Sequence, residues 1–366
     1  MEVTDLQMVR LCLLQAIWLA ALFLCSEGNA EAKTENDILI SVSVSPDARF
    51  VSTLEFSDSH SLIRELNRTP TIPASFSPDW TRARIKAGNR DLAFDYMDRL
   101  LDPKKSRQYL LSQSLSAKLE ELVQTVEKAH YGKAIHWEKV KHSFGRMKYA
   151  TVIDLETGER FNVQRRAGSR HADVQPLTRS DTQIMKHIYQ GKWSWKRRAI
   201  LVEVDGIYYA ASMHGMPHGA GAIQGNDFPG HFCIHFTGSS THLRKEPDPS
   251  HSLMILKAAG ALPHKILEAG PKELVGYFLT SLNEHDSHSL RMMTDASRLP
   301  AGLGDIESVR KPEDISSPSA DLFMVEIPVR VDYSLRSGGQ RSGRCRFLLL
   351  RSAPWERWRI VDVVLP

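Results

Sequence analysis

The chain has 366 residues, of which 42% are hydrophobic and 25% are charged, and its formal net charge is +4. Because this charge is mild and the basic residues are scattered, we expect no nucleic-acid partner. The length suffices for two or three hydrophobic cores of roughly 100–150 residues each.

The N-terminal segment has the pattern of a bacterial export signal. An apolar run over residues 11–25 follows Arg10, and the small residues Ala30 and Ala32 fit the rule for signal peptidase. The run is shorter than the ~20 apolar residues that a membrane-spanning helix needs. We therefore expect residues 1–32 to be a cleaved signal peptide. The mature protein is then secreted or held in the cell envelope, and it meets the membrane only during export.

Two cysteines, Cys233 and Cys345, remain after that cleavage. A disulfide scaffold needs more cysteines, and these two fall in different expected domains. We expect free thiols, with a single bridge between them as the alternative.

Residues 33–136 are expected to form an N-terminal region with a hairpin, a linker and a helix. Two β-like runs, 38–44 and 50–56, predict the hairpin. The proline-rich stretch 68–79 predicts a loop, and leucines at helical spacing predict a helix from about 106 to 129.

Residues 137–260 predict a mixed α/β domain with a mainly antiparallel sheet. Its expected elements are a hairpin of 149–154 and 160–163, a helix capped at Ser180-Asp181, strands at 199–204, 207–213 and 231–236, and a closing helix at 248–259.

Residues 261–366 predict a C-terminal α+β domain. A helix over 271–284 precedes three strands near 323–327, 345–350 and 358–364. This order resembles the cone-shaped fold of the nuclear transport factor 2 type. The whole chain is therefore expected to be α+β.

The strand around Cys233 carries the residues best suited to chemistry. Alternate side chains of a strand point to opposite faces, so His231, Cys233 and His235 share one face. The apolar residues between them, Phe232 and Ile234, share the other.

Three interpretations of this set stay open. In the first, Cys233 is a nucleophile whose thiolate is favoured by a neighbouring imidazole, as acyl transfer requires. In the second, the three strand residues, with His171 or Asp173, bind a tetrahedral zinc ion. In the third, the cysteine and histidines are structural residues of an interaction module.

The central region resembles a domain of exported Bacillota proteins that often accompanies stalk domains of the copper amine oxidase N-terminal type. The resemblance is carried by residues 168–177, 191–195, 210–219 and 230–236. It covers about a third of the chain and implies a cell-envelope setting.

The same motifs are distantly similar to L,D-transpeptidases, in which a His-Gly element precedes a Ser-His-Gly-Cys-Ile-Arg-like motif. His218-Gly219 and the segment 230–235 match these elements. The resemblance implies Cys233 as nucleophile, His218 as general base and His231 as part of an oxyanion site. Here Phe232 replaces the motif glycine and His235 replaces its arginine. A phenylalanine at this position is bulky enough to block an oxyanion hole, which leaves a catalytically silent wall-binding relative open.

We therefore expect a cysteine-dependent transpeptidase-like or hydrolase-like domain that acts on or binds peptidoglycan or another cell-wall polymer. The residues assigned to substrate binding are His235, His171, Asp173 and Trp195, the last because Trp193 and Trp195 beside basic residues suggest a glycan-stacking or anion-binding surface. No residue is assigned to a metal and no cofactor is expected, with a zinc hydrolase or structural zinc domain as the alternative. A non-catalytic wall-binding module is the other alternative.

Overall fold

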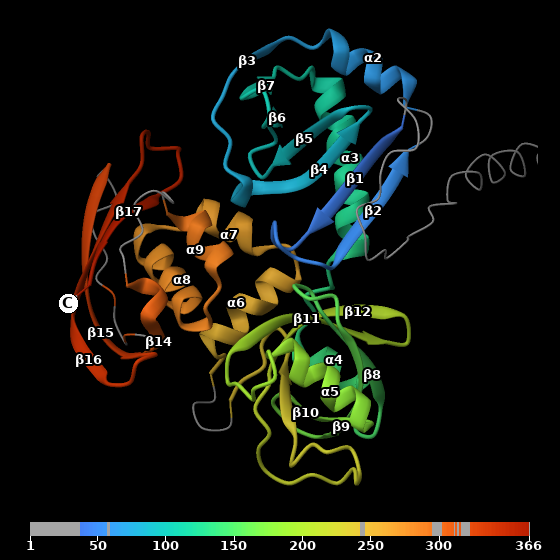
Figure 1. The fold of residues 1–366 in the computed structure, drawn as a ribbon, viewed down its shortest axis with the longest axis vertical. Helices are drawn as coiled ribbons and strands as arrows, with labels where there is room; N and C mark the ends of the chain where they lie inside the picture. The colour runs from blue at the N-terminus through green and yellow to red at the C-terminus, as the bar shows by residue number, and fades with distance from the viewer. Residues whose placement is uncertain are drawn as a thin grey trace, which may run out of the picture.

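The computed structural model describes residues 37–56, 59–241, 246–294, 302–310, 312, 315 and 323–365. This part of the chain contains eight α-helices and seventeen strands, and all strands within its sheets pair antiparallel, which confirms the α+β class (Figure 1). The expected signal peptide lies outside these ranges. Among the described helices, none has both the length and the apolar character needed to span a membrane.

The N-terminal part is a seven-stranded sheet of order β2-β1-β4-β5-β6-β7-β3, with the long helix α3 packed on β1 and β2. The predicted hairpin of β1 and β2 is confirmed. Its elements are β1 (Ile38–Ser43), β2 (Val51–Phe56), α2 (His60–Arg68), β3 (Thr71–Pro73), the 3-10 helix η1 (Pro78–Trp80), β4 (Thr81–Ala87), β5 (Arg90–Asp95), β6 (Leu100–Asp102), β7 (Arg107–Tyr109) and α3 (Gln113–His130).

Two sequence predictions in this part are wrong in detail. The helix α3 begins at Gln113, after the predicted start near residue 106, because residues 107–109 form the strand β7. β7 pairs with β3, which lies inside the stretch 68–79 that was predicted to be a loop. Ser112 then caps α3, since its hydroxyl accepts a hydrogen bond from the Leu115 amide at 3.1 Å.

The central part is a closed barrel of strand order β10-β13-β12-β11-β8-β9. Its predicted strands and its one predicted hairpin are confirmed, but the helix cap is Thr178, which forms a capping box with Asp181, and not Ser180. The elements are α4 (Trp137–Ser143), β8 (Tyr149–Asp154), β9 (Arg160–Ala167), β10 (Ala172–Pro176), α5 (Arg179–Ile188), β11 (Arg197–Val204), β12 (Ile207–His214) and β13 (Phe232–His235).

The C-terminal part packs a group of helices against a four-stranded sheet of order β14-β15-β16-β17. The predicted helix over 271–284 is α8, and Phe278 on α8 packs edge-on against Phe347 of the sheet at 5.5 Å. The elements are α6 (Pro249–Ala258), α7 (Leu262–Glu268), α8 (Pro271–Glu284), α9 (Ser287–Met293), the 3-10 helix η3 (Leu303–Asp305), β14 (Ile306–Arg310), β15 (Met324–Leu335), β16 (Gln340–Leu350) and β17 (Arg359–Val364).

The helix α6 connects the barrel to the C-terminal part. It packs on β11 and β12 and also on α8, and Figure 1 places it between the two. Its Leu253, Met254 and Ala258 belong to the same hydrophobic core as the C-terminal sheet. The domain limits at residues 136 and 260 stay predictions.

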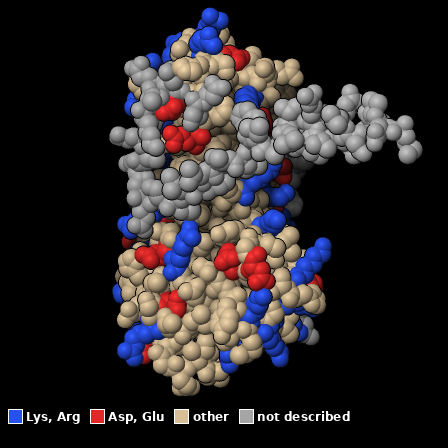
Figure 2. Space-filling view, turned by 90° about the vertical axis from the view of Figure 1, so that its right-hand side faces the viewer, with Lys and Arg blue, Asp and Glu red and all other residues tan. Residues whose placement is uncertain are grey.

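Lys257 of α6 is the charged centre of this junction. Its buried ammonium lies 2.8 Å from Glu156 Oε1 and 3.0 Å from Asp286 Oδ1. Glu156 also accepts a hydrogen bond from Ser45 at 2.7 Å, so all three parts of the chain meet at this cluster. By contrast, the surface in Figure 2 shows acidic and basic side chains interspersed.

The Lys257→Met substitution is expected to destabilise the fold by about 3–5 kcal/mol at pH 7, because it leaves buried carboxylates without their cation. Burial alone would raise the pKa of Asp286, but the Lys257 charge brings it to about 2. Because the pKa of Asp286 is lower in the folded chain than its unfolded value near 4, its ionised form adds about 2 kcal/mol to the free energy of unfolding above pH 4. This contribution is lost as the pH falls towards 2.

The difference in the free energy of unfolding between Lys257→Met and the native chain, measured by urea unfolding, should therefore become smaller from pH 7 to pH 3. Lys265→Met is the control, because Lys265 pairs on the surface with Glu268. A difference that does not change with pH would contradict the assignment.

A candidate cysteine and histidine site on the barrel

The site lies on the outer face of three neighbouring strands. Phe232 and Ile234 of β13 point into the barrel core, so Cys233 faces outward, as predicted. Across the strands Cys233 pairs with Asp173 of β10, and Ser212 of β12 pairs with His235. Directly opposed residues of antiparallel strands project to the same side, so the barrel register collects these polar side chains into one patch.

A glycine shapes β10 at this point. Gly168 has φ of +89°, and a Cβ there would lie 2.1 Å from the carbonyl oxygen of His171. The β9–β10 ladder also shifts register between Asp173 and Val174. Only glycine tolerates both the backbone angle and the close approach, so Gly168 permits the tight turn that leads into β10. The extra residue of the irregular pairing, Arg166, lies on β9 opposite Asp173 and Val174.

The loop between β12 and β13 brings His218 to the site. His218 and His231 exchange two backbone hydrogen bonds of 2.9 Å each. The buried side chain of Gln175 holds the loop: its amide donates to the Gly230 carbonyl at 2.8 Å, and its oxygen accepts from the Ala222 amide at 2.8 Å. His218 is therefore held opposite His231, two residues before Cys233 on the same strand segment.

Cys233 Sγ lies 3.4 Å from His218 Nε2 and 3.7 Å from Asp173 Oδ1. The same Asp173 oxygen lies 3.1 Å from His171 Nε2 and 3.9 Å from His231 Nε2. The structure thus brings together the sulfur, the predicted base and three other predicted site residues.

Hydrogen bonding sets the tautomer of His218. Its Nδ1 donates to the Met216 carbonyl at 3.1 Å, because a carbonyl can only accept. Nε2, which faces the sulfur, is then the basic nitrogen. Burial lowers the pKa of His218, which keeps its imidazole neutral at pH 7.

The thiol is not ionised in the resting protein. Burial, and then the negative charge of Asp173, raise the pKa of Cys233 well above its ordinary value. This corrects the expectation of a thiolate favoured by its imidazole neighbour: the geometry supports a neutral thiol beside a neutral base.

Three imidazoles are stacked behind the cysteine. The His235 ring lies 4.5 Å from His171 and 3.8 Å from His251 between centroids, with interplanar angles of 12° and 4°. His251 Nδ1 lies 3.0 Å from the Ser212 hydroxyl. His235 and His171 are each 3% exposed, so their assignment to direct substrate binding is corrected to a place in the site wall.

Phe232 and His231 also differ from expectation. Phe232 is fully buried in the barrel core, so it does not block the space beside the sulfur. His231 Nδ1 donates to the Ala220 carbonyl at 3.0 Å, so that nitrogen is not available to an oxyanion.

Of the two tryptophans considered, only Trp195 reaches the site. Its side chain is 50% exposed, and its ring centroid lies 4.7 Å from His214 and 5.4 Å from His218. Trp193 instead packs edge-on against Phe228 at 5.3 Å.

Gln175, His214 and His251 received no role in the site from the sequence, although His214 belongs to the same histidine-bearing, glycine-rich segment as His218. His214 precedes the glycine-rich loop, and its position on the outward face of β12 could have been found by alternation along that strand. The His251 and Gln175 contacts depend on tertiary packing, for which the local sequence carries no signal.

Comparisons of the chain with protein-family models, with characterised proteins and with solved structures return no match. The resemblances to the exported domain and to L,D-transpeptidases therefore stay predictions, as does the likeness of the C-terminal part to nuclear transport factor 2.

The Asp173→Asn substitution is expected to increase the rate of Cys233 alkylation by iodoacetamide at pH 8 roughly 10-fold, since removing the negative charge beside the sulfur lowers the thiol pKa. Peptide mass spectrometry separates Cys233 from Cys345, the other free thiol. Asp205→Asn is the charge-matched control, because Asp205 is exposed in a barrel turn and pairs with Lys148. Equal rates in the native and Asp173→Asn chains would show that Asp173 does not act on the thiol.

Proposed function

We propose that the barrel is a cysteine-dependent acyltransferase or hydrolase of the L,D-transpeptidase type, acting on peptidoglycan stem peptides in the bacterial cell envelope. The observation that carries the proposal is the pair of Cys233 Sγ and His218 Nε2 at 3.4 Å, with the tautomer of His218 set by the Met216 carbonyl. A nucleophile within reach of an oriented base is the minimum arrangement for covalent acyl transfer.

The chemistry balances with these two residues alone. As Sγ attacks the peptide carbonyl carbon, the thiol proton passes to His218 Nε2, and a tetrahedral intermediate forms. The C–N bond then breaks, and His218 returns the proton to the leaving amine, which leaves a thioester on Cys233. An acceptor amine, or water, attacks the thioester and gives its proton to His218, and the thiol is restored.

The raised thiol pKa fits a transfer in which proton removal accompanies attack. A preformed thiolate would be repelled by Asp173, whereas a neutral thiol is tolerated beside that carboxylate. Burial lowers the pKa of His218, so its neutral form persists below pH 6.5. His218 can therefore accept the thiol proton over a wide range of pH.

Cys233→Ala is expected to abolish turnover of a disaccharide tetrapeptide, and His218→Ala to lower kcat by about 10²–10⁴-fold. The acidic limb of kcat/KM should lie below pH 6.5. Chromatography of the muropeptide products measures turnover, with Cys345→Ala and His142→Ala as controls for a second buried thiol and an exposed histidine. Undiminished turnover by Cys233→Ala would refute covalent catalysis.

A second candidate is a zinc site, which two groups of residues favour. His214, His218 and Cys233 form one group, and His171, Asp173 and Cys233 form the other; within each group the ligand atoms lie within 4.8 Å of one another. Tetrahedral zinc with bonds of 2.0–2.3 Å separates its ligand atoms by about 3.3–3.7 Å. The Sγ to Nε2 and Sγ to Oδ1 distances of 3.4 and 3.7 Å match that spacing.

If zinc binds here, the purified chain should carry about one equivalent of the metal, measured by plasma emission spectrometry after dialysis. Cys233 belongs to both groups, so Cys233→Ala should lose the metal, while Cys345→Ala keeps it. A metal-free chain that turns over muropeptides would eliminate this candidate.

A further inference from the structure

Trp195 is an exposed aromatic side chain at the edge of the site. Half of its surface meets solvent, although its ring contacts His214 and the base His218. A half-exposed indole next to His218 offers a large, flat apolar face to a ligand that enters the site.

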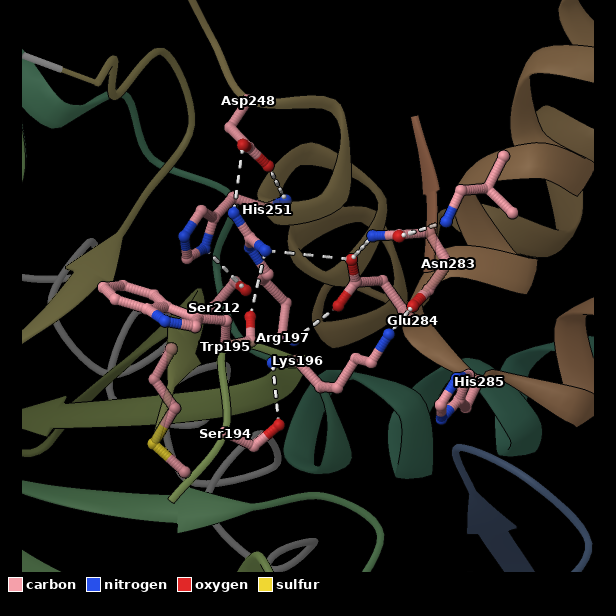
Figure 3. Close-up of polar contacts among 12 residues, drawn as sticks. Ser194, Trp195, Lys196, Arg197, Ser212, Asp248, His251, Asn283, Glu284 and His285 are labelled. Atoms are coloured by element: carbon pink, nitrogen blue, oxygen red, sulfur yellow. Dashed lines mark hydrogen bonds and ion pairs between the residues drawn. The ribbon is translucent and has the colours of Figure 1, made fainter. Parts of the chain in front are cut away.

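The backbone around Trp195 is fixed by the C-terminal part of the chain. The Trp195 carbonyl accepts from Arg197 Nη1 at 2.9 Å, and the Arg197 amide donates to Glu284 Oε2 at 2.5 Å. Lys196 Nζ donates to the Asn283 carbonyl at 2.5 Å. Figure 3 shows these contacts converging on the segment 194–197 from the end of α8.

A third anchor comes from the start of α6. Asp248 accepts from Arg197 Nη2 at 3.2 Å, and its other oxygen accepts from the His251 amide at 3.0 Å. The Glu284 carboxylate is fully buried, so the charge that faces Arg197 is not screened by water. The exposed indole therefore stands on a rigid backbone.

The distances limit which part of a substrate the indole can touch. The indole centroid is 5.4 Å from that of His218, whose Nε2 is 3.4 Å from the sulfur. The indole thus lies at most about 10 Å from Sγ, the length of roughly three extended residues. Peptide residues beside the reacting carbonyl fall within that reach, whereas the sugar at the far end of a stem peptide lies at or beyond its limit.

We propose that Trp195 binds the aliphatic side chain of the peptide residue that supplies the reacting carbonyl, and that Glu284 is the positioning residue that fixes it through Arg197. This inference rests on the proposed function. It replaces the expected glycan-stacking role with recognition of the peptide, and it gives the C-terminal part a duty at the barrel site.

The test compares two probes on the full chain: a sugar-free L-Ala-D-Glu-diaminopimelate-D-Ala tetrapeptide and the same peptide with its disaccharide. Trp195→Ala should raise KM for both probes by about 10-fold with little change in kcat, and Trp195→Phe should restore most of the affinity. Trp355→Ala is the matched control, because Trp355 is 86% exposed on the C-terminal part.

Binding to chains that carry Cys233→Ala, measured by calorimetry, gives a readout that does not need turnover. Trp195→Ala should weaken the tetrapeptide by the same factor. Glu284→Gln should weaken it in the presence of Trp195 and have no further effect once Trp195 is alanine, because a positioning residue acts only through the side chain that it places. Additive effects would refute the role of Glu284.

The outcomes separate the two proposals. If the native chain neither binds nor turns over either probe, the proposed function fails. If it binds both and Trp195→Ala binds them equally well, only the inference about Trp195 fails. A loss confined to the sugar-bearing probe would establish glycan stacking and overturn peptide recognition.

Discussion

The closure of the six-stranded barrel is the constraint on which the candidate site depends. A closed barrel has one interior, and the apolar residues Phe232 and Ile234 of β13 occupy it. The strand must then present Cys233 and His235 outward, and its neighbours place Asp173 beside Cys233 and Ser212 beside His235. A shift of one residue in register would send the cysteine into the core and remove the site.

Two electrostatic effects on the Cys233 thiol act in opposite directions. Asp173 and burial both hold the proton on sulfur, while His218 presents an unprotonated nitrogen at hydrogen-bonding distance. The resting site is therefore uncharged at the thiol and imidazole, and it stores no reactive thiolate that solvent oxidants could attack. Under the proposed acyl transfer, charge would develop at the sulfur only when an acyl group is bound, so the reaction would depend on an occupied site.

Local patterns in the sequence predict much of the fold, and they also predict which face of β13 carries the cysteine. Alternation and turn residues identify both hairpins, and leucine spacing identifies α3 apart from its start. Short pairings such as β3 with β7 are invisible because three residues carry no period. Contacts between Cys233 and Asp173, or His235 and His251, join residues distant in sequence, and one chain contains no information on register between them.

The amide contact between Arg197 and Glu284 has a consequence for how this chain can be divided. A gene fragment that ends with the barrel would retain Cys233 and His218. It would lose His251 of the imidazole stack, which lies on α6, and Glu284, which lies on α8. Such a fragment is expected to lose both the complete imidazole stack behind Cys233 and the contact of Glu284 with Arg197 that holds the backbone next to Trp195. The barrel and the helices after it are therefore expected to fold as one structural unit, because contacts such as those of His251 and Glu284 join them.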